Sequence, residues 1–191
     1  METLVLASQS PRRIELLRLA GIPFETVKPD VDESCTCSAP DAVTILSARK
    51  ALEVCRHYPG RFILAADTLV AINGSVLGKP ASEKDAAAML RALSGRTHQV
   101  YTGVSVIAPS GNILTESDQS DVTFCDISDE EISAYVKSGE PLDKAGAYAI
   151  QGRASMWVSH LDGNYTSVMG LPLCLIRSML LRAGYQFLPN R

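Results

Sequence analysis

The amino-acid sequence contains one long apolar segment that is interrupted by a carboxylate and a hydroxyl. Residues Phe62–Ala66 are all apolar, and the pattern resumes at Leu69–Ile72, immediately before the hairpin signal Asn73-Gly74. A continuous apolar run of this length is typical of a strand buried inside a sheet. Asp67 and Thr68 therefore fall within a buried strand, unless the strand ends earlier and Asp67 caps a turn.

Helix-start signals lie between the strand-like runs. The apolar run Leu4–Ala7 precedes Pro11, where a helix is predicted to begin before ending at Gly21. Further helices are predicted to open at Ser38 with Pro40, at Ser82, at Ser128 with Glu131, and at Leu173, the last of them running to Ala183.

Hairpins are predicted at two places besides Asn73-Gly74. Gln99–Ala108 turns and returns through Ile113 and Leu114, and Asp162-Gly163 is a further hairpin signal. Strands joined by both helices and hairpins predict a mixed α/β fold. The sequence has no internal repeat and no low-complexity linker, so residues 1–191 are expected to form a single domain.

Composition and charge exclude several classes of protein. A formal charge of −3 argues against binding a nucleic acid polymer through a broad basic surface, so any phosphate site must be local. No apolar run approaches the roughly 20 residues of a membrane span, and the N-terminus lacks a signal-peptide pattern, so we expect a cytoplasmic protein without a membrane partner. The five cysteines are expected to be reduced thiols.

The segment Ser8–Arg13 is the first candidate for binding phosphate. It places two hydroxyls, the start of a helix and the guanidinium groups of Arg12 and Arg13 within six residues. A helix N-terminus favours anions, and arginine matches the geometry of phosphate oxygens. The alternative is an ordinary helix start with surface arginines, although positive charge in a first turn opposes the helix dipole.

Acidic residues form the second candidate. A carboxylate such as Asp67 inside an apolar strand costs several kcal/mol unless it is paired, hydrated or bound to a metal. Asp32 and Glu33 add two carboxylates, which alternatively lie in a solvated loop. Oxygen ligands of this kind suit Mg²⁺ or Mn²⁺ holding a triphosphate. Lys79 in a turn supplies a cation, unless it merely flanks a hairpin.

Lys50 and the segment that carries Gln151 are the remaining candidates for ligand binding. Lys50 shares its helix stripe with packed apolar residues and is expected to point inward. The segment Leu142–Gly152 surrounds Tyr148 and Gln151 with small residues, so a ligand can approach its backbone while these side chains offer stacking and hydrogen bonding. A plain turn and strand is an equally good interpretation. The three histidines have no metal-ligand spacing and are expected at the surface or in packing.

These residues, in this order, resemble the Maf family of nucleoside triphosphate pyrophosphatases. The resemblance runs nearly end to end, through the blocks LASQSPRRIELL, VDE, SARKA, AADTLV, GKP, LSGRTHQVYTGV, EPLDKAGAYAIQG and GNYTSVMGLPL. Within the family, the Gln-Gly after AGAYAI and the stretch THQVYT look like the branch that acts on dTTP and UTP. The other branch, which acts on 7-methyl-GTP, is the nearer alternative. A nucleotide-binding inhibitor of septum formation without turnover is the more distant one.

The resemblance also implies roles for residues of this chain. Asp67 is expected to be the proton acceptor, and Glu33 is expected at the phosphate and metal end. For the reaction, our hypothesis is that Asp67 and Glu33 hold a divalent metal; metal coordination lowers the basicity of a carboxylate, so the sequence leaves open whether Asp67 acts mainly as base or as ligand. Arg12, Thr68 and Gln151 are expected to set base specificity, and we expect the amide of Gln151 to be buried. The phosphates are expected to contact Ser8, Arg13, Lys50 and Lys79. The implied fold is an elongated mixed sheet with flanking helices and two lobes around a cleft, similar to that of inosine triphosphate pyrophosphatases, and the implied assembly is a homodimer.

Overall fold

The computed structural model describes residues 1–187, and the helices predicted to open at Pro11, Ser38, Ser82, Ser128 and Leu173 are present in that order. A strand at Phe24–Thr26, a short helix at Tyr165–Val168 and three 3₁₀ helices were not predicted. The strands are β1 (Leu4–Leu6), β2 (Phe24–Thr26), β3 (Ile63–Ile72), β4 (Ser75–Leu77), β5 (Thr97–Ile107), β6 (Ile113–Phe124) and β7 (Val158–Asp162). The α-helices are α1 (Pro11–Leu19), α2 (Ala39–Cys55), α3 (Glu83–Leu93), α4 (Asp129–Lys137), α5 (Tyr165–Val168) and α6 (Leu173–Arg182). The 3₁₀ helices are η1 (Glu140–Asp143), η2 (Ala145–Ala147) and η3 (Arg153–Trp157).

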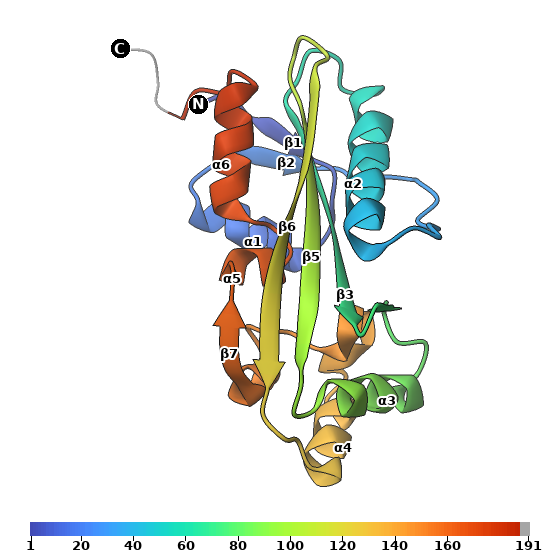
Figure 1. The fold of residues 1–191 in the computed structure, drawn as a ribbon. Helices are drawn as coiled ribbons and strands as arrows, with labels where there is room; N and C mark the ends of the chain where they lie inside the picture. Colours follow the sequence, from blue (N-terminus) through green and yellow to red (C-terminus); the bar gives the residue numbers. More distant parts are fainter. Residues whose placement is uncertain (188–191) are drawn as a thin grey trace. The chain divides into compact units, whose positions relative to one another are not determined.

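The strands of residues 1–187 form one mixed sheet of seven, drawn in Figure 1. Their order is β2-β1-β3-β5-β6-β7, and β4 pairs with β3. β1 is parallel to both β2 and β3, whereas β4 and β7 run antiparallel to their partners. Parallel pairs joined through helices, together with antiparallel hairpins, confirm the mixed α/β fold that the sequence predicts.

The chain divides into two compact units, and three of the four divisions fall within the long strands β3, β5 and β6. Unit 1 comprises Met1–Asp67, Thr102–Asp118 and Gly170–Arg191. Unit 2 comprises Thr68–Tyr101 and Gln119–Met169. Each unit has its own set of packed helices.

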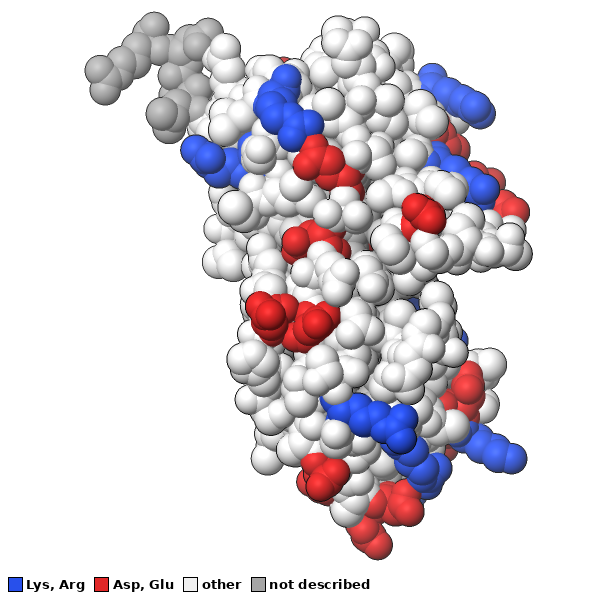
Figure 2. Space-filling model, in the orientation of Figure 1, with Lys and Arg blue, Asp and Glu red and all other residues white. Residues whose placement is uncertain are grey.

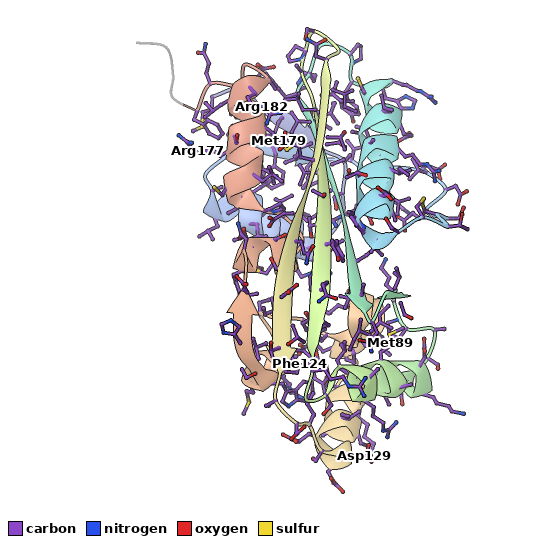
Figure 3. All side chains as sticks on the ribbon, in the orientation of Figure 1. Met89, Phe124, Asp129, Arg177, Met179 and Arg182 are labelled. Atoms are coloured by element: carbon purple, nitrogen blue, oxygen red, sulfur yellow. A yellow bond between two sulfur atoms is a disulfide. The ribbon has the colours of Figure 1, made fainter. Side chains whose placement is uncertain are left out.

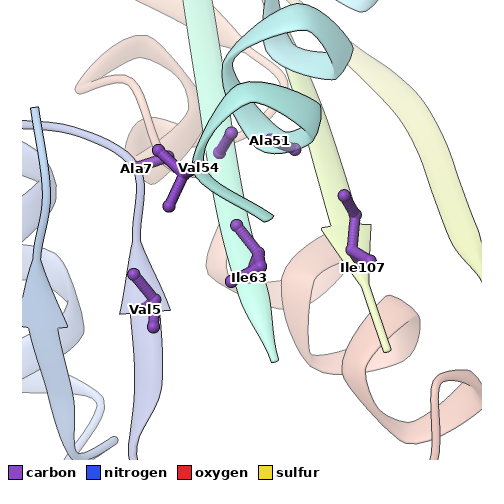
Figure 4. Close-up of a cluster of buried hydrophobic side chains, with 7 residues drawn as sticks. Val5, Ala7, Ala51, Val54, Ile63 and Ile107 are labelled. Carbon is purple, nitrogen blue, oxygen red and sulfur yellow. The ribbon is translucent and has the colours of Figure 1, made fainter. Parts of the chain in front are cut away.

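One hydrophobic cluster of unit 1 lies between the sheet and α2. Its side chains come from β1, α2, β3 and β5, and Figure 4 shows them together: Val5, Ala7, Ala51, Val54, Ile63, Ala65 and Ile107. Helix α2 can approach β5 closely because Gly103 has no side chain, since a Cβ there would collide with the backbone of Val43. Figure 1 shows α1 and α6 on the opposite side of this part of the sheet.

The pleat of β3 directs Asp67 toward α2. Alternate residues of a strand point to the same face, and Ile63 and Ala65 both pack in the cluster beneath α2. Asp67 is the next residue on that face and is 8% exposed. The strand continues to Ile72, so the alternative in which it ends at Ala66 is wrong, and the prediction of a carboxylate inside a buried strand is confirmed.

Unit 2 is built on α3, α4 and the three 3₁₀ helices. Ser82 and Ser128 cap α3 and α4 through their side chains, and Ser128 forms a complete capping box with Glu131, as predicted. Helices α3 and α4 pack against each other, and their buried residues include Leu90, Leu93 and Ile132.

An aromatic cluster forms the centre of unit 2. His98, Phe124 and Tyr148 meet edge to face at centroid distances of 4.9–5.3 Å, and Trp157 connects this group to Tyr135. Phe124 lies at the end of β6 (Figure 3). Tyr148 is buried, so the expectation that its ring offers a stacking surface is wrong: the ring is occupied by packing.

His98 makes the stability of unit 2 depend on pH. Burial lowers the pKa of His98 to about 4, and only the charge of Asp121 acts in the opposite direction. Between pH 6.5 and 4 the unfolded chain takes up a proton at this position that the folded chain excludes, so stability is lost as pH falls through this range.

Lowering the pH from 7.5 to 5.0 is expected to reduce the free energy of unfolding by about 2 kcal/mol through the His98 side chain. Urea titrations of the wild type and His98→Gln at both pH values measure it. An equal pH dependence in both proteins would contradict it.

Of two predictions for the last part of the chain, one is wrong and one is confirmed. Asp162-Gly163 does not form a hairpin: β7 ends at Asp162, and the Asn164 side chain caps α5 by accepting a hydrogen bond from Thr166. Gly163 has a φ of +129°, and a Cβ there would collide with Ser120. The Asp162-Gly163 pair therefore marks the connection from β7 to α5 and not a hairpin turn. Helix α6 agrees with the prediction and ends just before Gly184.

Candidate active site

The strongest cluster of charged side chains in unit 1 is centred on Lys50. Its Nζ lies 2.5 Å from Asp67 Oδ1 and 2.7 Å from Glu33 Oε1. Lys50 and Asp67 are buried, whereas the Glu33 side chain is 59% exposed. The helical stripe of α2 therefore points Lys50 inward, as predicted, and the lysine draws two predicted metal-binding carboxylates together.

Arg49 holds the loop that carries Glu33. Its Nη1 donates to the carbonyl oxygens of Asp32 (3.2 Å) and Ser34 (2.9 Å), on either side of Glu33. The Ser34 hydroxyl and amide both donate to the Asp32 carboxylate, and these hydrogen bonds hold the pKa of Asp32 below its usual value. Sequence reasoning missed Arg49, because its only signal was its position beside Lys50 on α2.

Two of the five cysteines form a disulfide, which the sequence did not predict. Cys35 and Cys37 form a disulfide in the loop just after Glu33, with their Cα atoms 5.6 Å apart. The prediction of reduced thiols is wrong for this pair because the loop folds back far enough to bring the two side chains together. Cys55, Cys125 and Cys174 are free, as predicted.

The second part of the unit 1 cluster lies at the start of α1. Arg13 donates from Nη1 to Ser8 Oγ (3.3 Å) and from Nε to the carbonyl of Gly170 (2.9 Å). Ser10 occupies the N-cap position of α1, but its side chain makes no capping hydrogen bond. The first turn of this helix therefore lacks a capping side chain at Ser10 and carries two arginines, and a helix N-terminus with such cationic groups favours an anion.

Electrostatic coupling joins these two parts. Burial lowers the pKa of the Arg13 guanidinium, while Asp67 and Glu33 raise it and Arg12 lowers it further. Arg13 is therefore close enough to Asp67, Glu33 and Arg12 to interact with them electrostatically. Unit 1 thus brings six predicted site residues into one cluster: Ser8, Arg12, Arg13, Glu33, Lys50 and Asp67.

Unit 2 contains the three other predicted site residues. Thr68 is half-buried on β3, Lys79 is exposed after β4, and Gln151 is exposed in the turn before η3. Gly146 donates from its amide to the carbonyl of Gly78, which ties the turn carrying Lys79 to the segment ahead of Gln151. The view of Gln151 as a buried amide is wrong, since its side chain faces solvent.

Surface features agree with a local rather than an extended phosphate site. On the face drawn in Figure 2, the described Lys and Arg side chains are scattered among Asp and Glu and form no continuous basic surface. Across residues 1–187, none of the helices has the length and apolar character needed to cross a membrane. Over the same residues, no group of three or more His, Cys, Asp or Glu side chains is arranged to hold a metal ion.

Comparison with solved structures shows the class of fold. The chain is similar to the Ham1 protein of Staphylococcus aureus, with a TM-score of 0.52 and 15% identity over 95% of this chain and 99% of that one. A HAM1 protein from Coxiella burnetii gives a TM-score of 0.50 and 17% identity over 95% of this chain and all of that one. At these identities the likeness concerns the fold alone.

Comparison of sequences shows the family. Residues 3–183 match the family model described as Maf-like protein. A dTTP/UTP pyrophosphatase of Geobacillus sp. (strain WCH70) is 46% identical over 97% of this chain and 100% of its own length. A dTTP/UTP pyrophosphatase of Bacillus cereus (strain AH820) is 47% identical over 98% of this chain and 96% of its own length. The chain belongs to the Maf family.

Proposed function

We propose that this chain hydrolyses dTTP and UTP to the nucleoside monophosphate and pyrophosphate. The observation that carries the proposal is the buried Asp67 carboxylate, held by Lys50 beside Glu33 and within electrostatic range of Arg13. Relatives that share 46% and 47% of their residues with this chain are dTTP/UTP pyrophosphatases, which supports the choice of substrate.

The residues of unit 1 suit attack of water on the α phosphorus. Asp67 accepts a proton from the attacking water, and Lys50 holds the Asp67 carboxylate in place. An ammonium has three donors, so Lys50 retains capacity for a phosphate oxygen after binding two carboxylates. Arg13 and the N-terminus of α1 offset the negative charge that develops on the departing pyrophosphate, and Ser8 contributes a further phosphate contact. For Lys79 of unit 2, a phosphate-binding role rests on the family resemblance alone.

The acids of this cluster fit a divalent metal such as Mg²⁺ or Mn²⁺. The Asp67 and Glu33 carboxylates both contact the Lys50 ammonium, so their oxygen atoms lie close enough together to act as ligands of one metal ion. Mg²⁺ in nucleotide sites is commonly held by one or two carboxylates together with water and phosphate oxygens, so two protein ligands are sufficient. When bound, such an ion withdraws charge from the phosphate oxygens.

Removal of metal is expected to abolish turnover. Activity on UTP should disappear in excess chelator and return when Mg²⁺ or Mn²⁺ is added beyond it, because the cluster and the triphosphate are both oxygen ligands. Glu33→Gln is expected to raise the Mg²⁺ concentration needed for half-maximal rate. Glu53→Gln, on the same α2 helix as Lys50 but outside the cluster, is the control. Full activity in excess chelator would eliminate the metal from the proposal.

Product analysis tests the proposed reaction itself. Incubation with dTTP or UTP in ¹⁸O-labelled water is expected to yield monophosphate that carries the label and unlabelled pyrophosphate, since water attacks at the α phosphorus. Orthophosphate, or label in the pyrophosphate, would overturn the assignment. Including 7-methyl-GTP in the panel tests the other branch of the family, and an absence of turnover on every nucleotide would favour a nucleotide-binding inhibitor of septum formation.

The proposal also covers organisation and location. We expect residues 1–191 to act as one Maf-like domain, because a single family match runs through both units. A homodimer and a cytoplasmic location follow from the family resemblance and from the sequence. Light scattering at several protein concentrations measures the assembly state.

A further inference from the structure

The turn that carries Gln151 is anchored on both sides by two side chains outside it. Before the turn, the Ala149 amide donates to the Tyr135 hydroxyl at 3.2 Å. After the turn, the Arg153 amide donates to Glu140 Oε1, also at 3.2 Å. The turn itself is closed by the Gly152 amide, which donates to the Ala149 carbonyl at 3.0 Å. Gln151 thus stands on a backbone that is held two residues to each side.

The two anchors are linked to each other. The Tyr135 hydroxyl donates to the same Glu140 Oε1 at 2.9 Å while accepting from Ala149. Tyr135 is 3% exposed, and its burial raises the pKa of the phenol, so the hydroxyl remains protonated and able to donate. One carboxylate oxygen and one hydroxyl therefore serve both ends of the turn.

Gly152 provides the space for this arrangement. A Cβ at Gly152 would collide with the Glu140 carboxylate. The Glu140 carboxylate packs against the backbone of the turn at Gly152, the residue that follows Gln151. It fits there because Gly152 has no side chain. Since Gln151 faces solvent, its own side chain is not fixed by packing, and the backbone must set its direction.

We propose that Glu140 and Tyr135 are positioning residues that fix the turn bearing Gln151 and thereby sharpen selection of the base. The inference rests on the proposed role of Gln151 in reading the pyrimidine. A rigid backbone reduces the number of directions in which an exposed amide can point, so a matching base edge is bound with less loss of entropy. Neither residue takes part in the chemical step.

The first measurement tests the anchors without reference to substrate. Tyr135→Phe removes the hydroxyl but keeps the ring that packs on Trp157. Amide hydrogen exchange is expected to accelerate at Ala149 in this variant and at Arg153 in Glu140→Ala. Glu140→Gln retains an oxygen acceptor and is expected to keep most of the protection at Arg153. Unchanged exchange at both amides would overturn the proposal.

The second measurement tests selectivity. Tyr135→Phe and Glu140→Ala are each expected to narrow the ratio of kcat/KM for UTP over CTP by about three- to tenfold, the size of effect typical of one hydrogen bond. Glu140→Gln is expected to restore most of the ratio. Ser128→Ala is the matched control, because it removes the cap of α4, which carries Tyr135, and costs stability without altering the anchors. Its ratio should equal that of the wild type.

A double-variant cycle shows whether the anchors act through Gln151. In a Gln151→Ala background, Tyr135→Phe is expected to produce no further change in the ratio. An additive effect, or a ratio in Tyr135→Phe that matches the wild type, overturns the proposal while leaving pyrophosphatase activity intact. Failure of the proposed function is a different result, namely a wild type that releases no pyrophosphate from UTP.

Discussion

Asp67→Asn is expected to lower kcat on UTP by about 10² to 10⁴ while the protein stays folded and binds nucleotide. The amide keeps the shape of the side chain but removes the charge needed to accept a proton or to bind a metal. Its oxygen can still accept a hydrogen bond from Lys50, and Glu33 remains 2.7 Å from the Lys50 ammonium, so the lysine is not left without a partner. The loss should therefore appear in rate far more than in stability.

The measurement is steady-state kinetics on UTP combined with thermal unfolding and nucleotide binding. Asp41→Asn is a suitable control: it makes the same change of charge in unit 1, at an exposed position in the first turn of α2. The control should retain a kcat close to that of the wild type. If Asp67→Asn keeps more than half of the wild-type kcat, Asp67 does not have the proposed role.

The sequence was sufficient to place Asp67 and Lys50 because their signals are local. A polar residue inside an apolar run marks a buried strand position, and a lysine within an apolar helical stripe marks an inward direction. Both inferences are confirmed by the burial of the two side chains and the 2.5 Å distance between Lys50 Nζ and Asp67 Oδ1. The helix starts at Ser38, Ser82 and Ser128 were equally local, since a cap involves residues only three apart.

The remaining features depend on contacts between distant residues. Tyr148 reads as a free aromatic in a small-residue segment, but it is buried against His98, which lies 50 positions away. Arg49 and the Glu140 anchor were missed for the same reason, because neither has a local pattern that distinguishes it from a surface charge. The roles assigned to Arg12, Thr68 and Gln151 remain predictions that follow from the family resemblance.

The wild type is expected to hydrolyse dTTP and UTP far faster than CTP. Thymine and uracil share an O4 carbonyl and an N3-H donor, whereas cytosine reverses this donor and acceptor pattern. Discrimination by a site that leaves polar groups unpaired can reach about 10⁴. Gln151 supplies only a small part of it, of the order of the three- to tenfold expected from fixing its turn, because an amide can rotate to present either its donor or its acceptor, and water can satisfy an exposed amide.

Arg12 must therefore provide most of the asymmetry, since a guanidinium only donates and so favours a carbonyl over an amino group. A hydrogen bond to a charged group contributes about 1.5 to 3 kcal/mol, so Arg12→Ala is expected to narrow the ratio of kcat/KM for UTP over CTP by roughly 10- to 100-fold. The Thr68 hydroxyl both donates and accepts, so Thr68→Val should change the ratio less. Arg18→Ala, at an exposed position in the last turn of the same helix, removes an equal charge and should leave the ratio unchanged. The measurement is kcat/KM for dTTP, UTP and CTP in the wild type and these three variants. A wild type that hydrolyses CTP as fast as UTP would refute the assignment to this pyrimidine edge. An Arg12→Ala protein that loses kcat/KM equally on UTP and CTP would make Arg12 a phosphate ligand instead.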